Sequence, residues 1–360
     1  MLHQLSFKYN LSTPVLVVVI AIAVYYLSPS SSVLQALDKS RDQRVMSSEM
    51  GLNIVNKVRS VLKHFVAIEQ SEGAGALVKR SIGTIQMRNF PPFLMLDNFD
   101  VSPPAGFPEH PHHGQETITY VLRGMMAHED FTGSKGVLRS GDLQFMTAGK
   151  AIVHSEIPVK MDNGESTQGL QLWVDLPNDI KNVEPRYRDL RREEIPLATP
   201  SDNLIVKVIS GESYGVKSLT ELAYTPVEFY HFISNKKNTE FAQPFTDDFS
   251  SFIYIMKGSI SISDQEYPES SAIFFKNDGD GIRGFTTSDN AEFAIIAGKY
   301  FNQKVVQYGP FVESSRENIV DVIQNYQNGV NGFENARTWS PVIKNGVTEA
   351  EVQQYLPKEN

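Results

Sequence analysis

The residues best suited to chemistry are histidines in one short window of the chain. Five of the eight histidines lie between residues 110 and 154. In a β-strand, residues i and i+2 face the same side, so His110 and His112 would point together, as would His154 and Glu156. On neighbouring strands these pairs would bring three imidazoles and one carboxylate to a single point. Such a set suits Fe(II) first, with Mn, Ni, Cu or Zn as alternatives, and leaves positions open for substrate or dioxygen.

Residues near these pairs are candidates for further ligands or for hydrogen bonds to the ligands. His113 would face away from its neighbour, which excludes it as a ligand. Glu116 is a rival carboxylate, and Gln115 and Glu129 are candidates for hydrogen bonding to the ligands. The chain contains no cysteine, so thiolate metal sites, disulfides and cysteine nucleophiles are excluded.

The body of the chain predicts an all-β protein. Short segments rich in Val, Ile, Thr and aromatic residues alternate with turn residues, a pattern typical of a β-sandwich or barrel. The segments TITYVLRG (117–124) and SFIYIMKG (251–258) have similar shape and lie 134 residues apart, which indicates two copies of one barrel. Residues 317–326 have the apolar periodicity of a helix, and the last twenty residues read as a loose tail.

The first forty residues differ from the rest. No charged residue occurs between Lys8 and Asp38, and residues 15–27 form an unbroken apolar run. We expect a hydrophobic helix that anchors the chain in a membrane through residues 11–37, with the main domain on the cytoplasmic side. A cleaved signal peptide, an organellar presequence or a buried element are the alternatives. The apolar spacing of residues 50–68 predicts a short amphipathic helix behind this segment.

Length and charge bound the function. The 360 residues suggest two domains, and the net charge of −9 argues against direct binding of nucleic acid.

Several blocks of the sequence resemble the pirin family. They include GFPEHPHHGQET (106–117), VHSE (153–156), GLQLWV (169–174) and GPFV (309–312), in that order. The likeness runs from about residue 69 to about residue 339. It implies two tandem cupin (jelly-roll) barrels, of which the first binds iron and the second has lost its ligands. The metal ligands implied are His110, His112, His154 and Glu156, the same set that strand geometry selects.

The resemblance also implies a function. Pirins are similar to quercetin 2,3-dioxygenase, so we expect an Fe(II)-dependent enzyme that opens a flavonol ring with dioxygen, with Glu156 as catalytic base. The alternative is a non-enzymatic protein whose metal redox state changes a surface seen by a protein partner, as in a transcriptional cofactor. His113 departs from the family, which usually has Arg there.

These arguments predict a domain order and a pocket. The expected divisions are a hydrophobic segment (1–37), a linker or helix (38–60), a metal-binding barrel (61–180), a linker (181–200), a barrel without metal (201–312) and a C-terminal helix and tail (313–360). The aromatic and apolar side chains expected to line a substrate pocket are Phe107, Phe131, Phe145, Met146 and Trp173.

Overall fold

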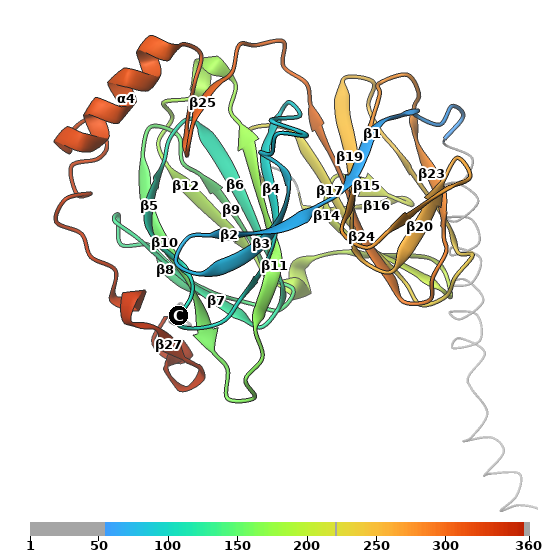
Figure 1. Ribbon diagram of the computed structural model, residues 1–360, viewed down its shortest axis with the longest axis horizontal. Coiled ribbons are helices and arrows are strands. Elements are labelled where there is room, and N and C mark those ends of the chain that lie inside the picture. The colour runs from blue at the N-terminus through green and yellow to red at the C-terminus, as the bar shows by residue number, and fades with distance from the viewer. Residues whose placement is uncertain (1–54, 220–221, 356–360) are drawn as a thin grey trace, which may run out of the picture. The chain divides into compact units, whose positions relative to one another are not determined.

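The computed structural model describes residues 55–219 and 222–355, which are mostly β-sheet (Figure 1). Two barrels follow each other, and each combines a seven-stranded sheet with a smaller one. The predicted all-β architecture is therefore confirmed. In the described residues, the one α-helix is α4 (Arg316–Asn328), which covers the stretch predicted to be helical.

The first barrel has two sheets that face each other. The larger contains, in spatial order, β12 (Arg186–Leu190), β9 (Leu143–Thr147), β6 (Gln115–Arg123), β11 (Thr167–Asp175), β4 (Phe93–Val101), β3 (Ala76–Ile82) and β2 (Ile68–Glu72). The smaller contains β27 (Val347–Thr348), β10 (Ile152–Lys160), β7 (Met125–Asp130) and β8 (Lys135–Arg139), with β5 (Phe107–His112) paired to β10.

The second barrel repeats this arrangement. Its larger sheet contains β1 (Val61–Val66), β22 (Ser271–Phe275), β19 (Phe249–Lys257), β24 (Ala291–Lys299), β17 (Val227–Ser234), β14 (Leu204–Ser210) and β13 (Leu197–Ser201). Its smaller sheet contains β18 (Glu240–Pro244), β23 (Gly281–Thr286), β20 (Ser259–Ile262) and β21 (Gln265–Pro268). The two similar sequence segments form β6 and β19, each third in its sheet, so the internal repeat is structural.

Short elements complete the fold. Two small pairs are β15 (Glu212–Ser213) with β16 (Val216–Lys217), and β25 (Val306–Tyr308) with β26 (Phe311–Glu313). The 3-10 helices are η1 (Asn178–Ile180), η2 (Arg192–Glu194), η3 (Val342–Asn345) and η4 (Glu349–Gln354). The tail was predicted to be loose. Instead Ile343, Val347 and Val352 are buried, and β27 pairs in parallel with β10.

The two barrels share one hydrophobic core. Side chains of β6 and β11 in the first barrel, such as Ile118 and Leu172, belong to the same buried cluster as Phe229 and Phe252 of β17 and β19. Burial of this apolar area is the main force that holds the barrels together. The interior of the second barrel is a separate apolar cluster.

Strand pairing crosses the divisions predicted from sequence. The residues 61–66 form β1, which pairs with β22 of the second barrel, although they were grouped with the first. The linker residues 186–190 form β12, which pairs with β9 of the first barrel. The helix predicted over residues 50–68 is wrong for its described part, because the backbone of β1 hydrogen-bonds along the sheet edge that β22 offers.

The segment before β1 is fixed on the second barrel. The Arg59 side chain is fully buried and donates to Ser251 Oγ at 3.1 Å and to the carbonyl oxygens of Gly279 and Thr246, each at 3.1 Å. The Asp280 carboxylate accepts from the backbone N–H of Lys57 at 2.9 Å. The hydrophobic segment and most of the linker (1–54) lie outside the described residues. Within 55–219 and 222–355, no helix combines the length and apolar character needed to cross a bilayer.

Candidate metal centre

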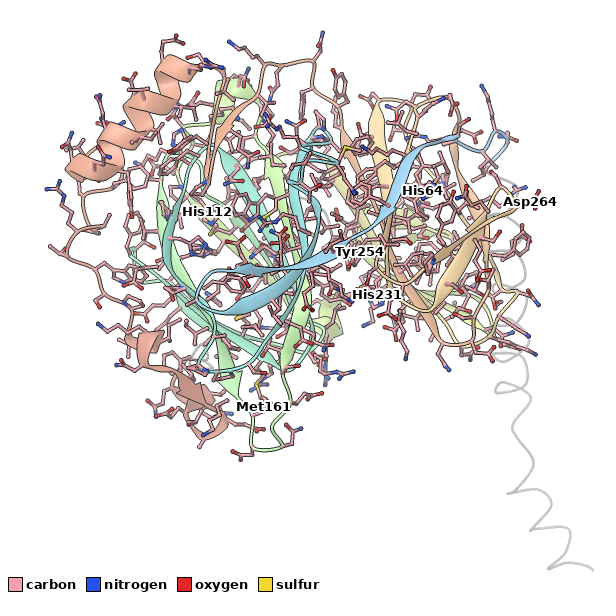
Figure 2. The ribbon with its side chains drawn as sticks, in the orientation of Figure 1. His64, His112, Met161, His231, Tyr254 and Asp264 are labelled. Carbon is pink, nitrogen blue, oxygen red and sulfur yellow. The ribbon has the colours of Figure 1, made fainter. Side chains whose placement is uncertain are left out.

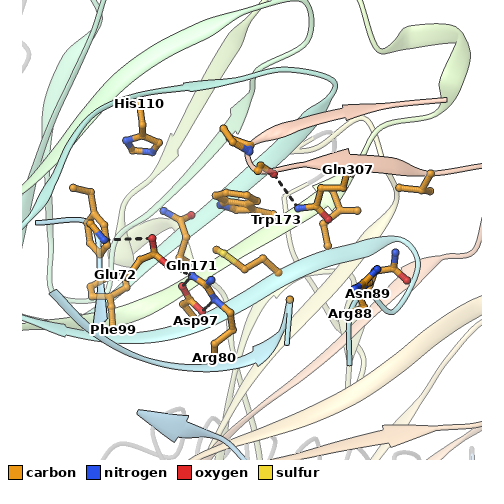
Figure 3. A pocket seen from close by; sticks show the side chains of 18 of the residues that line it. Glu72, Arg80, Arg88, Asn89, Asp97, Phe99, His110, Gln171, Trp173 and Gln307 are labelled. Atoms are coloured by element: carbon orange, nitrogen blue, oxygen red, sulfur yellow. Dashed lines mark hydrogen bonds and ion pairs between the residues drawn. The ribbon is translucent and has the colours of Figure 1, made fainter. Parts of the chain in front are cut away.

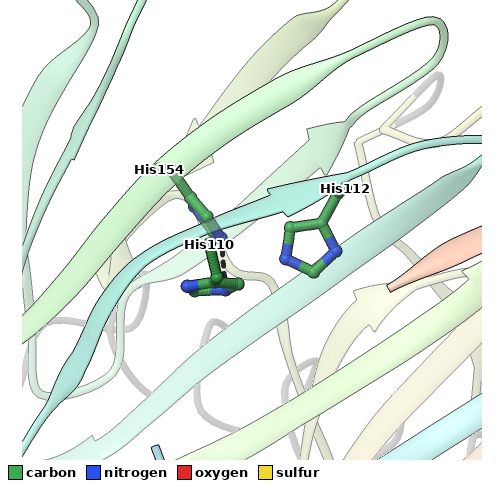
Figure 4. Close-up of side chains that lie close together, drawn as sticks. All are labelled: His110, His112 and His154. Carbon is green, nitrogen blue, oxygen red and sulfur yellow. Dashed lines mark hydrogen bonds between the residues drawn. The ribbon is translucent and has the colours of Figure 1, made fainter. Parts of the chain in front are cut away.

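Three histidines meet inside the first barrel. His110 and His112 lie on β5, and His154 lies on the neighbouring β10, directly opposite His110 in the strand register. Their ring nitrogens fall within 4.8 Å of one another, and Nε2 of His154 is 3.0 Å from Nε2 of His110 (Figure 4). The strand geometry expected from the sequence thus brings these three imidazoles together.

Hydrogen bonds at Nδ1 orient the rings of His110 and His112. His110 Nδ1 lies 2.7 Å from the Pro108 carbonyl oxygen and therefore carries its proton there, which leaves a lone pair on Nε2. Gln115 Nε2 donates to His112 Nδ1 at 3.0 Å and to the Pro310 carbonyl oxygen at 2.8 Å. His154 Nδ1 is buried and has no hydrogen-bond partner among the described residues. The donation of a ring N–H to a backbone carbonyl oxygen, as in His110, is typical of metal-binding histidines.

The electrostatics keep the cluster neutral. Burial lowers the pKa of His110, and lowers the pKa of His112 and His154 further below the usual range, with neighbouring imidazoles adding to the effect. Neutral imidazole is the form that binds metal.

The spacing of the nitrogens fits a metal ion. Two nitrogens that each lie about 2.1 Å from one ion, at a right angle, are about 3.0 Å apart. The separation between Nε2 of His110 and Nε2 of His154 matches this value. The three imidazoles are therefore a candidate site for a divalent metal.

Glu156 lies beside the cluster but outside the group of three. The pairing of β10 with β5 shifts register between His154 and Glu156, and such an irregularity re-aims a side chain. Its carboxylate accepts from Thr119 Oγ1 at 3.1 Å and from Gln171 Nε2 at 3.0 Å. Burial raises the pKa of Glu156 to about 7, although both hydrogen bonds oppose the rise. The carboxyl group can thus hold or release a proton near neutral pH.

A cavity of about 920 Å³ opens beside His110 and Glu156 (Figure 3). Trp173 lines it and packs edge-on against His112, with ring centroids 5.0 Å apart. Phe107 lines it too, as expected. Phe131, Phe145 and Met146 do not line this cavity, because their side chains are packed in buried hydrophobic clusters.

Other candidate residues have different partners. Glu116 accepts from Thr147 Oγ1 at 2.6 Å and from the backbone N–H groups of Tyr224 and Thr225, each at 2.9 Å, so it ties the barrels together. Glu129 accepts from the backbone N–H of Val342 at 2.8 Å and holds the C-terminal segment.

His113 points away from the cluster. Its Nδ1 lies 2.7 Å from the Lys150 carbonyl oxygen and its Nε2 lies 3.0 Å from Glu313 Oε1. Both ring nitrogens are thus engaged outside the histidine cluster.

The second barrel does not repeat the cluster. It contains His64, which is exposed on β1, and His231, whose Nδ1 lies 2.9 Å from the hydroxyl oxygen of Tyr120 of the first barrel, where the barrels meet (Figure 2). The interior is filled by Phe232, Phe241 and Phe293, whose ring centroids lie 4.6–5.9 Å apart.

Sequence reasoning missed one wall of the cavity. Residues between 304 and 310, together with Arg316, line it although they follow the second barrel in the chain. They are held there by His113, whose backbone N–H donates to the Pro310 carbonyl at 3.2 Å and whose carbonyl accepts from Val312 at 3.0 Å. The order of the motifs along the sequence contains no information about distances. Only the pairing of residues 309–312 with His113 would have located this wall.

Tandem barrels with a histidine cluster in the first define a two-barrel cupin with one candidate metal centre. The profile of the Pirin family matches residues 75–174, and that of the Pirin C-terminal cupin domain matches residues 230–332. A pirin-like protein of Solanum lycopersicum is 43% identical over 291 residues, which cover 80% of this chain and 98% of the relative. Pirin of Mus musculus is 42% identical over 285 residues, 77% of this chain and 95% of the relative. The chain belongs to the pirin family.

Solved structures agree with the fold. A quercetin 2,3-dioxygenase from Acinetobacter baumannii superposes with a TM-score of 0.70 at 23% identity, over 76% of this chain and 98% of that one. The pirin YhhW from Escherichia coli, in complex with nickel(II), superposes with a TM-score of 0.52 at 20% identity, over 66% of this chain and all of that one. Likeness at this level of identity shows that the fold is shared.

Proposed function

We propose that the chain is a metal-dependent dioxygenase of the quercetin 2,3-dioxygenase type, which opens a flavonol ring with dioxygen. The observation that carries the proposal is the three-histidine cluster, which has His110 on the wall of a cavity of about 920 Å³. His110, His112 and His154 would hold one divalent ion, with Fe(II) as the first choice. Glu156 would either complete the ligand set or act as the base.

The bound ion would act as a Lewis acid that favours loss of the proton from a coordinated hydroxyl group. The other tasks fall to side chains of this chain. Glu156 would accept the proton of the substrate hydroxyl on a carboxylate oxygen. The Thr119 and Gln171 hydrogen bonds hold that carboxylate in place.

The cavity would orient the substrate and exclude water. Trp173 offers an aromatic surface next to His112 on which a flat ring system can pack. Phe99, Phe107 and Met95 add apolar walls. A cavity of about 920 Å³ with aromatic walls favours turnover of a small aromatic molecule over the alternative, a surface that serves only as a metal-dependent contact for a protein partner.

The names of similar structures support the reaction class. One protein of the same fold is a quercetin 2,3-dioxygenase, and another binds nickel(II). The choice of a flavonol and of iron for this chain is part of the proposal.

Dioxygen uptake tests the proposal directly. The full chain is loaded with one Fe(II) per molecule without oxygen, and uptake is then followed with and without quercetin. His110→Ala is the test variant. His64→Ala is its control, because His64 is an exposed histidine on β1 and is not among the residues that line the cavity.

Uptake that needs quercetin and occurs in the wild type and in His64→Ala, but not in His110→Ala, would support a dioxygenase. Absence of uptake by wild-type protein that holds one iron would overturn the activity and leave the redox-dependent interaction protein as the function to test.

A further inference from the structure

The charged side chains around the cavity fall into two groups. The Arg80 guanidinium is neutralised by Glu72 at 2.6 Å and by Asp97 at 2.7 Å. Arg88, Lys304 and Arg316 also line the cavity and are exposed, yet none of them has a carboxylate within 4.0 Å in the described part of the chain. Three cations at one cavity without an ion-pair partner are available to a ligand.

The cavity is polarised along its length. Arg88 and Asn89 lie on the opposite side of Trp173 from His110 (Figure 3). Glu72 and Glu109 line the cavity together with His110. The negative charge of Glu72 opposes the lowering of the pKa of His110 by burial. An anionic group on a ligand is therefore repelled from the acidic end and attracted to the arginine end.

The segment after the second barrel contributes the other two exposed cations to the lining of the cavity. Lys304 precedes β25, and Arg316 is the first residue of α4, a 13-residue helix whose N-terminus adds partial positive charge. Glu317 is an exposed acid near these two cations. Hydrogen bonds from its own backbone N–H and from Ser315 lower its pKa most, and the charges of Lys304 and Arg316 lower it further. One negative charge against two positive charges leaves these three exposed side chains with a net positive charge.

We propose that the cavity selects an aromatic substrate with an acidic group, such as a carboxylate, sulfonate or phosphate ester, at the end remote from the histidines. This inference rests on the proposed function and adds the substrate class. The flat ring system packs on Trp173, and the acidic group binds Arg88, Lys304 and Arg316. Arginine is suited to the task because its planar fork matches the oxygen atoms of such groups. A neutral flavonol would leave these cations unused.

Binding is measured on the full chain without added metal, by quenching of tryptophan fluorescence. The two probes are quercetin and its sulfonated derivative, which differ by one permanent negative charge. Trp173→Phe identifies the part of the signal that arises in the cavity, since the other tryptophan, Trp339, is not among its lining residues.

The test variant replaces Arg88, Lys304 and Arg316 by Gln together. The control replaces Lys236, Lys237 and Lys276, which are exposed on the second barrel and are not among the cavity residues, so that net charge changes equally. In the wild type at low salt, the sulfonate should bind about tenfold more tightly than quercetin, from contributions of about two- to threefold per exposed cation. The preference should vanish in the test variant, persist in the control and shrink at high ionic strength.

Equal affinity for both probes in the wild type would overturn the inference, as would a preference that survives in the test variant. Failure of the proposed function looks different. If iron-loaded protein takes up no dioxygen with either compound while the charge-dependent preference holds, the ligand class stands and the activity falls. If quercetin is turned over without any preference for the sulfonate, the activity stands and the ligand class falls.

Discussion

The contact between His113 and Glu313 joins the first barrel to the wall of the cavity that follows the second barrel. Glu313 is buried, and its carboxylate accepts from Asn318 Nδ2 at 3.1 Å and from the backbone N–H of Ser314 at 3.0 Å, besides facing His113. Burial alone would raise the pKa of Glu313, but these hydrogen bonds outweigh it and lower the pKa from 4.5 to about 2.

Glu313→Gln keeps the shape of the side chain and removes the charge. Because the pKa of Glu313 is lower in the folded than in the unfolded chain, the carboxylate stabilises the fold above pH 4.5, and this contribution is lost as the pH falls towards 2. A pKa shift of one unit corresponds to about 1.4 kcal/mol, so the shift from 4.5 to about 2 contributes about 3 kcal/mol to the free energy of unfolding at pH 7. At pH 3 the contribution falls to about 1.5 kcal/mol.

The free energy of unfolding in urea should therefore be lower in the variant than in the wild type by about 3 kcal/mol at pH 7, and the difference should halve by pH 3. Glu269→Gln, a change at an exposed carboxylate of the second barrel, is the control and should leave both values within about 0.5 kcal/mol. A difference between Glu313→Gln and wild type that is the same at pH 7 and pH 3 would refute the reasoning, since the charge of Glu313 would then have no role.

Three further predictions concern the site, the barrel contact and the N-terminal segment. His110→Ala or His154→Ala should abolish stoichiometric metal binding while circular dichroism stays unchanged, and a full metal load in either variant would show that the ligand assignment is wrong. Gly114→Ala should destabilise the chain by about 2–4 kcal/mol in urea, because φ is +72° and the new Cβ would lie 2.0 Å from the Val312 carbonyl oxygen; no change would mean that this contact relaxes freely. A fluorescent fusion of residues 1–40 should reach a membrane or organelle, and a diffuse cytosolic signal would contradict the anchor.

The histidine cluster was predictable because it depends on strand parity and on one register pair. Residues i and i+2 on β5 share a face, and His154 lies directly opposite His110. The sequence shows that His110 and His112 share a face of their strand, but it does not show that this strand pairs with the one that carries His154. The shift in register between His154 and Glu156 was not predictable in the same way, because no residue type marks it.

Long-range partners were beyond the reach of local pattern. The apolar spacing of residues 61–66 fits a helix as well as a strand, and only the free edge of β22, some 200 residues later, decides between them. The position of Lys304 and Arg316 was also not predictable, because in the sequence they follow the second barrel, whereas in the structure they line the cavity of the first. Their role at the cavity depends on the pairing of His113 with the strand that carries Phe311.

The partner of β1 has a consequence for how the chain is made. β1 leaves the ribosome before any other described strand, but its neighbour β22 follows only after about 200 residues, which takes about 10–40 s at ordinary rates of synthesis. During that interval the first barrel can assemble its large sheet while the backbone edge of β1 has no strand to pair with. The first barrel in turn lacks β27 until the end of the chain arrives. Each barrel is thus finished by a strand from the opposite end of the sequence, so a nascent chain released early would carry two open sheet edges, and premature termination should produce aggregation rather than a smaller working protein.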